Sequence, residues 1–319
     1  MIKKISTVLM ILVFMNLLQA QSPTDLIQRI GEQVLTGYTR PLVSAFGSAL
    51  NTGLFHTANS HKPGGFDLQL KAMYIPIPED GKTFQYRVPG LYVNTSTMTV
   101  DTFWFTGSAS TVFGPEDSTV VYQGQDTVAI PSVLPGGTGI SFFPFIMPQL
   151  SVGVYYGSEI LIRFIPSFTI PGLDEKVSFW GVGIKEDITE LPFDFLQNLP
   201  VDIALQGVYQ NLKVGDIITS SALNFNLQAS KTFSVITPYL GLGWEDAKLN
   251  FNYDFTYDEL QPNGQVQPRT VNINFDVPAD NKIRLVAGFS LNLGPVLFNA
   301  AYNLSKYSAI SAGLGLSIR

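Results

Sequence analysis

The sequence predicts an all-β protein, a transmembrane antiparallel β-barrel with a short N-terminal helical segment. Hydrophobic and polar side chains alternate over most of the chain, which is the period of a strand with two different faces. Only 14% of the residues are charged, against about 25% in an ordinary soluble domain. A segment typical of an export signal precedes the alternating part. Together these observations favour an exported barrel with an apolar exterior.

Residues 1–20 are typical of a secretory signal peptide. Lys3 and Lys4 give a basic start, an apolar run follows, and the small residue Ala20 precedes the expected cleavage. The apolar run is shorter than the roughly 20 residues of a transmembrane helix. Cleavage removes Lys3 and Lys4 and no acidic residue, so the net charge changes from −6 to −8. An acidic mature chain argues against nucleic acid as a partner.

Residues 21–64 are expected to form an amphipathic helix and a loop. Pro23 opens a typical helix start, apolar residues then recur at helical spacing, and Pro41 predicts a kink or a break. A stretch rich in Gly and Asn, residues 51–65, ends the helix. This segment either plugs the barrel lumen or lies on the periplasmic side.

Residues 65–319 are expected to form the barrel itself. Several alternating segments approach the length of about 9–11 residues that a membrane-crossing strand needs. Their second face carries Ser, Asn, Gln and Gly with few charges, whereas a secreted sandwich would carry many charges there. Closure satisfies the backbone within the sheet and tolerates an apolar exterior. The clearest segments are residues 66–72, 150–164, 201–206, 223–228, 282–293, 296–303 and 310–319.

The strand count is expected to be about 12, within a range of roughly 10 to 14. Residues 82–138 are the least regular part and are read as two to four strands with long loops. Aromatic residues near strand ends fit interfacial girdles, although scattered core aromatics would give the same pattern. They are Phe142, Phe143, Phe145, Tyr155, Tyr156, Trp180, Trp244, Tyr302 and Tyr307.

The stretch from Leu150 to Phe164 is interpreted as one β-hairpin. Its even residues are apolar and should face lipid, and its odd residues should face the lumen. An odd-numbered loop keeps both faces in phase, because a slip of one residue would reverse every side chain. A loop of residues 156–158 would place Tyr155 opposite Glu159 and Ser151 opposite Arg163.

The remaining candidates for function are inward-facing ionisable residues. Such residues at membrane depth suggest a functional site, and the alternative is an ion-pair network that only stabilises the barrel. The candidates are Asp67, Lys71, Glu159, Arg163, Lys185, Asp202 and Arg284.

The sequence contains no signature of catalysis or metal binding. It has no cysteine and no Gly-x-Ser-x-Gly elbow. Its two histidines, His56 and His61, have no acidic neighbour in sequence, so we expect them to contact the loop or plug and to bind no zinc. We therefore expect a protein that is not an enzyme and has no cofactor; a lipid hydrolase is the least favoured alternative. An acidic cluster is interpreted as a solvated external loop: Glu245, Asp246, Asp254, Asp258 and Glu259.

Three segments carry a resemblance to a known family: "SALNTGLFHTANSHKPGGFDL", "FPFIMPQLSVGVYYGSEILIRFIP" and "FWGVGIKEDI" followed by "LPVDIALQGVY". The chain resembles uncharacterised outer-membrane β-barrel proteins of Bacteroidota over most of its mature length. It is also similar, more loosely, to outer-membrane transporters of the long-chain fatty acid type, whose N-terminal segment plugs the lumen. These resemblances imply location in the outer membrane and a barrel fold.

The function expected from the sequence is passage or binding of small molecules, apolar ones included, through a porin-like barrel surrounded by outer-membrane lipid. The alternative is a structural or assembly component of the outer membrane without transport activity, whose acidic loops would meet a protein partner in the envelope.

Overall fold

The structure of the protein is a computed structural model. It describes residues 23–94, 99–117, 119–121, 132–134, 136–155, 157–169, 175–191, 199–260 and 266–318. The expected signal peptide, residues 1–20, lies outside the described residues. In the part described, no helix combines the length and apolarity that crossing a membrane would require.

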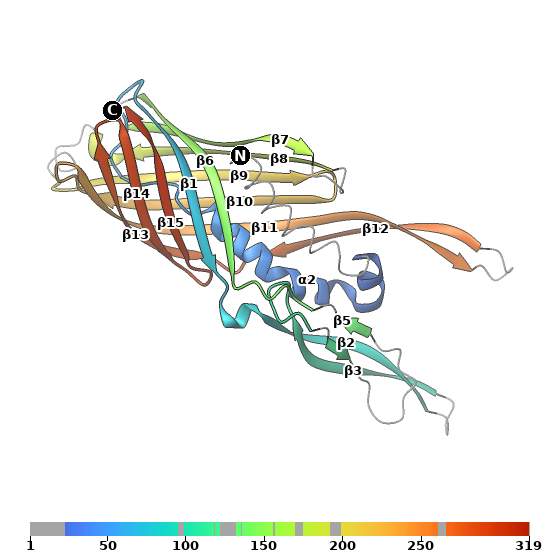
Figure 1. The fold of residues 1–319 in the computed structure, drawn as a ribbon. Helices are drawn as coiled ribbons and strands as arrows, with labels where there is room; N and C mark the ends of the chain where they lie inside the picture. Colours follow the sequence, from blue (N-terminus) through green and yellow to red (C-terminus); the bar gives the residue numbers. More distant parts are fainter. Residues whose placement is uncertain are drawn as a thin grey trace. The chain divides into compact units, whose positions relative to one another are not determined.

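Ten antiparallel strands close into a barrel (Figure 1). They are β1 (Phe66–Pro76), β6 (Phe142–Tyr155), β7 (Ser158–Thr169), β8 (Lys176–Asp187), β9 (Asp202–Val214), β10 (Ile218–Ser230), β11 (Ile236–Leu260), β13 (Ile283–Leu293), β14 (Val296–Leu304) and β15 (Ala309–Ile318). Neighbours around the ring are β10-β9-β8-β7-β6-β1-β15-β14-β13-β11, and pairing of β11 with β10 closes it. The fold-class prediction is confirmed, and the ring has the smallest strand number of the expected range.

The two ends of the barrel differ in how the chain connects the strands. β1 begins and β15 finishes at the same end, where Phe66 pairs with Ile318. We call this the terminal end and the opposite one the loop end. At the loop end, residues 77–141 separate β1 from β6.

The chain divides into two compact units. The barrel unit comprises Val43–Pro76, Phe142–Asn252 and Pro278–Arg319, and the other comprises the chain through Leu42, Ile77–Ser141 and Tyr253–Val277.

Within the second unit, β2 pairs with β3 and β4 pairs with β5. The described residues between 82 and 138 therefore contain the four strands β2 to β5. Counting this region toward the strands of the barrel was wrong, because these strands form sheets of their own. β12 extends the sheet beside β11 outside the closed ring. The bounds are β2 (Thr83–Asn94), β3 (Thr99–Ser110), β4 (Thr119–Val121), β5 (Ser132–Leu134), β12 (Val266–Pro278), and the short 3-10 helices η1 (Glu79–Gly81) and η2 (Ile188–Glu190).

The outer face of the barrel is apolar. The alternation of strand side chains places one set outward on every strand, and large hydrophobic residues of this set are about half exposed. Such a surface would be unfavourable in water and suits lipid. Examples from around the ring are Leu68, Ile162, Ile184, Leu205, Phe225, Leu240, Leu285, Tyr302 and Leu314.

The inner face is polar and densely packed. Its buried polar and charged side chains come from all parts of the ring and include Asp67, Lys71, Gln149, Glu159, Arg163, Lys185, Gln210, Asn226, Glu245, Arg284 and Asn299.

The helix α2 (Pro23–Leu50) continues through Pro41. Its first part lies in the second unit, where the hydroxyl of Tyr38 donates a hydrogen bond to the carbonyl of Gly136 at 3.0 Å. Its last part, from Val43, belongs to the barrel unit.

The hairpin of β6 and β7 keeps the expected faces in a different register. Glu159 and Arg163 are buried inward, while Ile160 and Ile162 lie on the opposite face. However, Glu159 pairs with Gly153, and Arg163 pairs with Gln149, where Tyr155 and Ser151 were expected. The register is shifted by two residues beside a β-bulge. A shift of two leaves the faces unchanged, because the side-chain period is also two.

The acidic cluster lies in β11, so the prediction that it lies in an external loop is wrong. Alternating residues from Leu249 onward carry the strand signal that the charges concealed. Glu245 is buried inward and pairs with Arg284, while Asp246 is half-buried and pairs with Lys282.

The prediction of interfacial aromatic girdles is correct only in part. Phe143, Phe145 and Tyr307 are buried, because they share the inner parity or lie in an internal turn. The exposed members are Phe142, Tyr155, Trp180, Trp244 and Tyr302, and Tyr156 lies outside the described residues.

Replacing Leu314 by Arg tests whether the outer face contacts lipid. Leu314 is 60% exposed near the middle of β15, and an arginine on a lipid face near the bilayer midplane costs about 2–4 kcal/mol. We expect the free energy of unfolding from bilayers to fall by about that amount, as measured by urea titration. Leu314→Ile is the matched control, and equal stability of the two variants would contradict a lipid-facing position.

Candidate functional site

The chain from Val43 to Gly65 passes through the barrel, and we call it the lumen segment. Near the loop end, the Ser44 hydroxyl accepts a hydrogen bond from the amide of Asp280 at 2.9 Å. One turn later, the Ser48 hydroxyl donates to the carbonyl of Tyr307 at 2.7 Å. These contacts place the last turns of α2 just inside the loop end.

The same segment reaches the terminal end nine to twelve residues after Ser48. Thr57 and Ser230 place their hydroxyl oxygens 3.1 Å apart, and the Ser60 hydroxyl donates to the carbonyl of Gly157 at 2.8 Å. Ser230 ends β10 and Gly157 lies in the turn before β7. The lumen segment therefore crosses the interior from the loop end to the terminal end.

The crossing requires α2 to end inside the barrel, where its last carbonyl groups need donors. Arg163 supplies two of them. Its Nη1 donates to the carbonyl of Leu50 at 2.6 Å and its Nη2 to the carbonyl of Thr52 at 2.9 Å. Its Nε donates to Gln149 at 2.9 Å, and Gln210 also donates to Leu50 at 2.8 Å. A buried cation is stabilised there by the negative end of the helix dipole.

Arg284 approaches the same turn from β13. Its Nη2 donates to the carbonyl of Ser48 at 3.2 Å, and its Nη1 donates to the hydroxyl of Thr52. The same Nη2 lies 2.7 Å from a carboxylate oxygen of Glu245. Arg284 thus joins the helix end to the wall through one ion pair.

Lys71 is the third buried cation at this level. Its Nζ donates to the side-chain oxygen of Asn299 at 2.8 Å, and Asn299 donates onward to Gln69 at 2.7 Å.

Near the terminal end, two histidines of the lumen segment meet two acids of the wall. His56 and His61 each place Nε2 3.0 Å from a different oxygen of Asp67. The other ring nitrogen of His61 lies 2.6 Å from Glu159, which also pairs with Lys185 at 3.1 Å. Because both ring nitrogens of His61 lie within ion-pair distance of carboxylate oxygens, this environment favours the protonated ring.

Burial by itself would lower the pKa of His61, but hydrogen bonds and charges from Asp67 and Glu159 outweigh it and raise the pKa. Within the described residues, no group of His, Cys, Asp or Glu is arranged to hold a metal ion.

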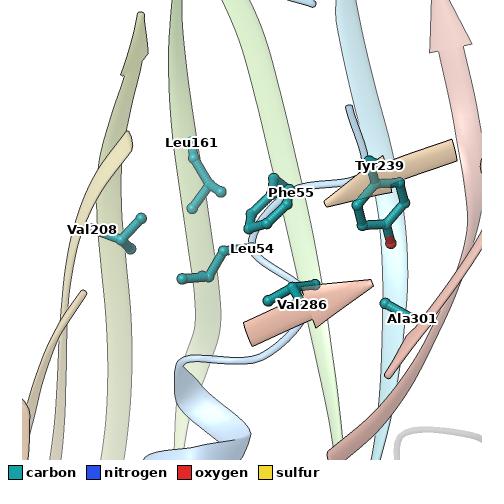
Figure 2. Packing of buried hydrophobic residues seen from close by; sticks show 7 residues of the cluster. All are labelled: Leu54, Phe55, Leu161, Val208, Tyr239, Val286 and Ala301. Atoms are coloured by element: carbon teal, nitrogen blue, oxygen red, sulfur yellow. The ribbon is translucent and has the colours of Figure 1, made fainter. Parts of the chain in front are cut away.

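Between the two polar levels lies an apolar cluster, shown in Figure 2. Leu54 and Phe55 of the lumen segment enter a patch of wall side chains from five strands: Leu161, Val208, Tyr239, Val286 and Ala301. The Phe55 and Tyr239 rings meet edge to face, with centroids 5.6 Å apart.

Wall glycines leave room for the lumen segment. A Cβ atom on Gly241 would lie 2.4 Å from the ring of Phe55, and one on Gly153 would lie 2.4 Å from the carbonyl oxygens of His61 and Lys62. The wall is therefore shaped to the segment.

The structure places six of the seven candidate residues in this interior. Asp67, Glu159 and Lys185 form the histidine cluster, and Lys71, Arg163 and Arg284 surround the end of α2. Asp202 is half-buried at the start of β9, where it pairs with Ser230 of β10, and it makes contacts of its own.

Sequence reasoning missed the partners that complete the site. His61 meets Glu159 of β7, which is distant in sequence, and no local pattern indicates this pairing, whereas Asp67 of β1 follows His61 by only six residues. Glu245 could have been found, because it lies on the inward parity of the alternating stretch from Leu240.

The fold and the occupied interior define a closed antiparallel β-barrel that contains part of its own N-terminal region. Residues 1–318 match the model described as "Family of unknown function (DUF6588)", and the chain belongs to this family. No curated protein matches the chain.

Among solved structures, the chain is similar to the β domain of the Bordetella autotransporter Brka, with 11% identity, 81% of this chain and 100% of that chain covered, and a TM-score of 0.35. The chain is also similar to Ail, the attachment invasion locus protein of Yersinia pestis, with 10% identity, 80% of this chain and 97% of that chain covered, and a TM-score of 0.21. Its similarity to the Ralstonia pickettii toluene transporter TbuX has 10% identity, 82% of this chain and 91% of that chain covered, and a TM-score of 0.24. These barrel neighbours are outer-membrane proteins. Because each TM-score lies below 0.5, we draw no functional conclusion from them.

Replacing His61 by Gln should remove a pH-dependent part of the stability. The raised pKa of His61 means that its protonated form stabilises the fold fully below the unfolded value of about 6.5. That contribution is lost as pH rises through the folded pKa. We expect the melting temperature of the wild type to exceed that of His61→Gln most at about pH 6 and least at about pH 9.

Thermal unfolding in detergent micelles would measure this difference. Asp67, Glu159, Lys185 and His56 face His61 and are present in both proteins, so the comparison isolates His61. A difference that stays constant with pH would contradict the prediction.

Proposed function

We propose that this protein is an outer-membrane barrel for the passage of small molecules and that the lumen segment is its gate. The observation that carries the proposal is the way the segment is held. Wall side chains donate hydrogen bonds to backbone carbonyls of Leu50, Thr52 and Leu54. A segment fixed by such bonds closes the barrel and can be exchanged for water, because water also accepts hydrogen bonds.

The apolar outer face supports the location. Half-exposed Leu, Ile, Phe and Trp side chains surround the ring, and a bilayer is the environment in which they are stable. An expected signal peptide and the resemblance of the sequence to Bacteroidota outer-membrane barrels point in the same direction.

The inner wall supports a water-filled path once the segment moves. Most side chains facing the segment are Gln, Asn, Ser, Lys and Arg, which are stable in water. A permanently closed core would gain more from apolar side chains than from buried charges.

The apolar cluster supports solutes with an apolar part. If Leu54 and Phe55 withdraw, they uncover Leu161, Val208 and Val286 on an otherwise polar wall. An amphipathic path of this kind would accept a small molecule that has both a polar and an apolar part. Transport of wholly apolar solutes, the expectation from the fatty-acid-transporter resemblance, stays a prediction.

A second candidate is a closed structural scaffold that binds an envelope protein. It is favoured by the extent to which the interior is filled: Arg163 and Arg284 are almost fully buried and each makes several hydrogen bonds. The two candidates differ in whether the segment ever moves.

Single-channel recording on the full chain distinguishes them. Leu54→Ser with Phe55→Ser removes the apolar contact and should increase the frequency of open events above that of the wild type. Adding Thr57→Cys and Ser230→Cys to this protein creates a redox-controlled tether. The two hydroxyl oxygens lie 3.1 Å apart, so the thiols can form a disulfide, and the chain has no other cysteine.

We expect the oxidised tethered protein to be silent and reduction to restore the current. Each single-cysteine variant controls for the substitutions. If correctly inserted barrels carry no current with the apolar contact removed and the tether reduced, the gate proposal is wrong and the scaffold is favoured.

A further inference from the structure

The lumen segment covers a group of three buried cations. Lys71, Arg163 and Arg284 come from β1, β7 and β13 and point into the same level of the barrel. Arg163 lies close enough to Lys71 and Arg284 for their charges to repel. Such a concentration of positive charge in a narrow interior requires negative partners.

Most of the groups that these cations contact are neutral. Arg284 pairs with Glu245, but among the described residues neither Lys71 nor Arg163 forms an ion pair with a carboxylate. Lys71 donates to Asn299, and Arg163 donates to Gln149, Gln210 and two carbonyls. Asp67 attracts Lys71 from further away while it is engaged by both histidines.

The carbonyls at the end of α2 therefore act as the counter-charge. Ser48, Leu50 and Thr52 present oxygen atoms to Arg163 and Arg284, and the C-terminal end of a helix carries about half a negative charge. When the segment withdraws, this partial charge leaves with it. The cations then face the open path with one carboxylate partner, Glu245, at their level.

We propose that the opened barrel selects small anionic solutes, with Lys71, Arg163 and Arg284 as the selectivity residues. Rings of Arg and Lys are the arrangement by which pores select anions, and a low-dielectric wall concentrates their field. Nearer the terminal end, Glu159 keeps its ion pair with Lys185 when His61 leaves with the segment, whereas Asp67 loses both histidines and becomes a carboxylate beside the path. A carboxylate or phosphate group on the solute would take the place of the helix carbonyls. This inference rests on the proposed gate.

The test is the reversal potential in a potassium chloride gradient, measured on the Leu54→Ser, Phe55→Ser protein. We expect chloride to be more permeant than potassium. Lys71→Gln together with Arg163→Gln should move the permeability ratio toward or below one. Added inorganic phosphate should reduce the chloride current in the first protein more than in the second.

Two controls separate selectivity from folding. Arg163→Lys keeps the charge and should keep the anion preference, and Lys213→Gln removes an exposed charge on β9 and should change nothing. Absence of any current would contradict the gate itself. Current without anion preference, or a preference insensitive to Lys71 and Arg163, would overturn this inference alone.

Discussion

The helix α2 ends inside a β-barrel, and the unsatisfied carbonyl groups of its last turn are the constraint on which the interior depends. In water these groups would be solvated, but in a filled lumen they need donors from the wall. Arg163 and Arg284 supply those donors. The same bonds provide acceptors for two buried guanidinium groups, so helix end and wall satisfy one another.

A different interaction fixes the other end of the lumen segment. There the protein uses ionisable pairs, with His61 between Asp67 and Glu159, and the apolar contact of Leu54 and Phe55 lies between the two levels. The helix end is held by hydrogen bonds from Arg163, Gln210 and Arg284, whereas the loop is held partly by ion pairs of His61.

Much of the barrel could be predicted from the sequence, because strand alternation is a local property. Segments such as 66–72 and 282–293 show their faces directly, and the inward parity of Glu159 and Arg163 follows from the same period. Pairing is not local. The register of β6 and β7 differs from expectation by two residues, since a bulge changes which residues face one another without changing the pattern of faces. β11 was partly missed because acidic residues interrupt its apolar face near Glu245.

The sequence by itself determined the class of fold, and it predicted the apolar exterior and the inward face of residues such as Glu159 and Arg163, because each depends on a repeat of two along a single strand. Only the tertiary structure decided what those residues do. Glu159 meets His61, and Arg163 meets the end of α2, through contacts between segments far apart in the chain. The physical reason is that a buried charge is stabilised by whichever partners the closed barrel brings within a few ångströms, and closure joins strands whose order in space no local pattern records.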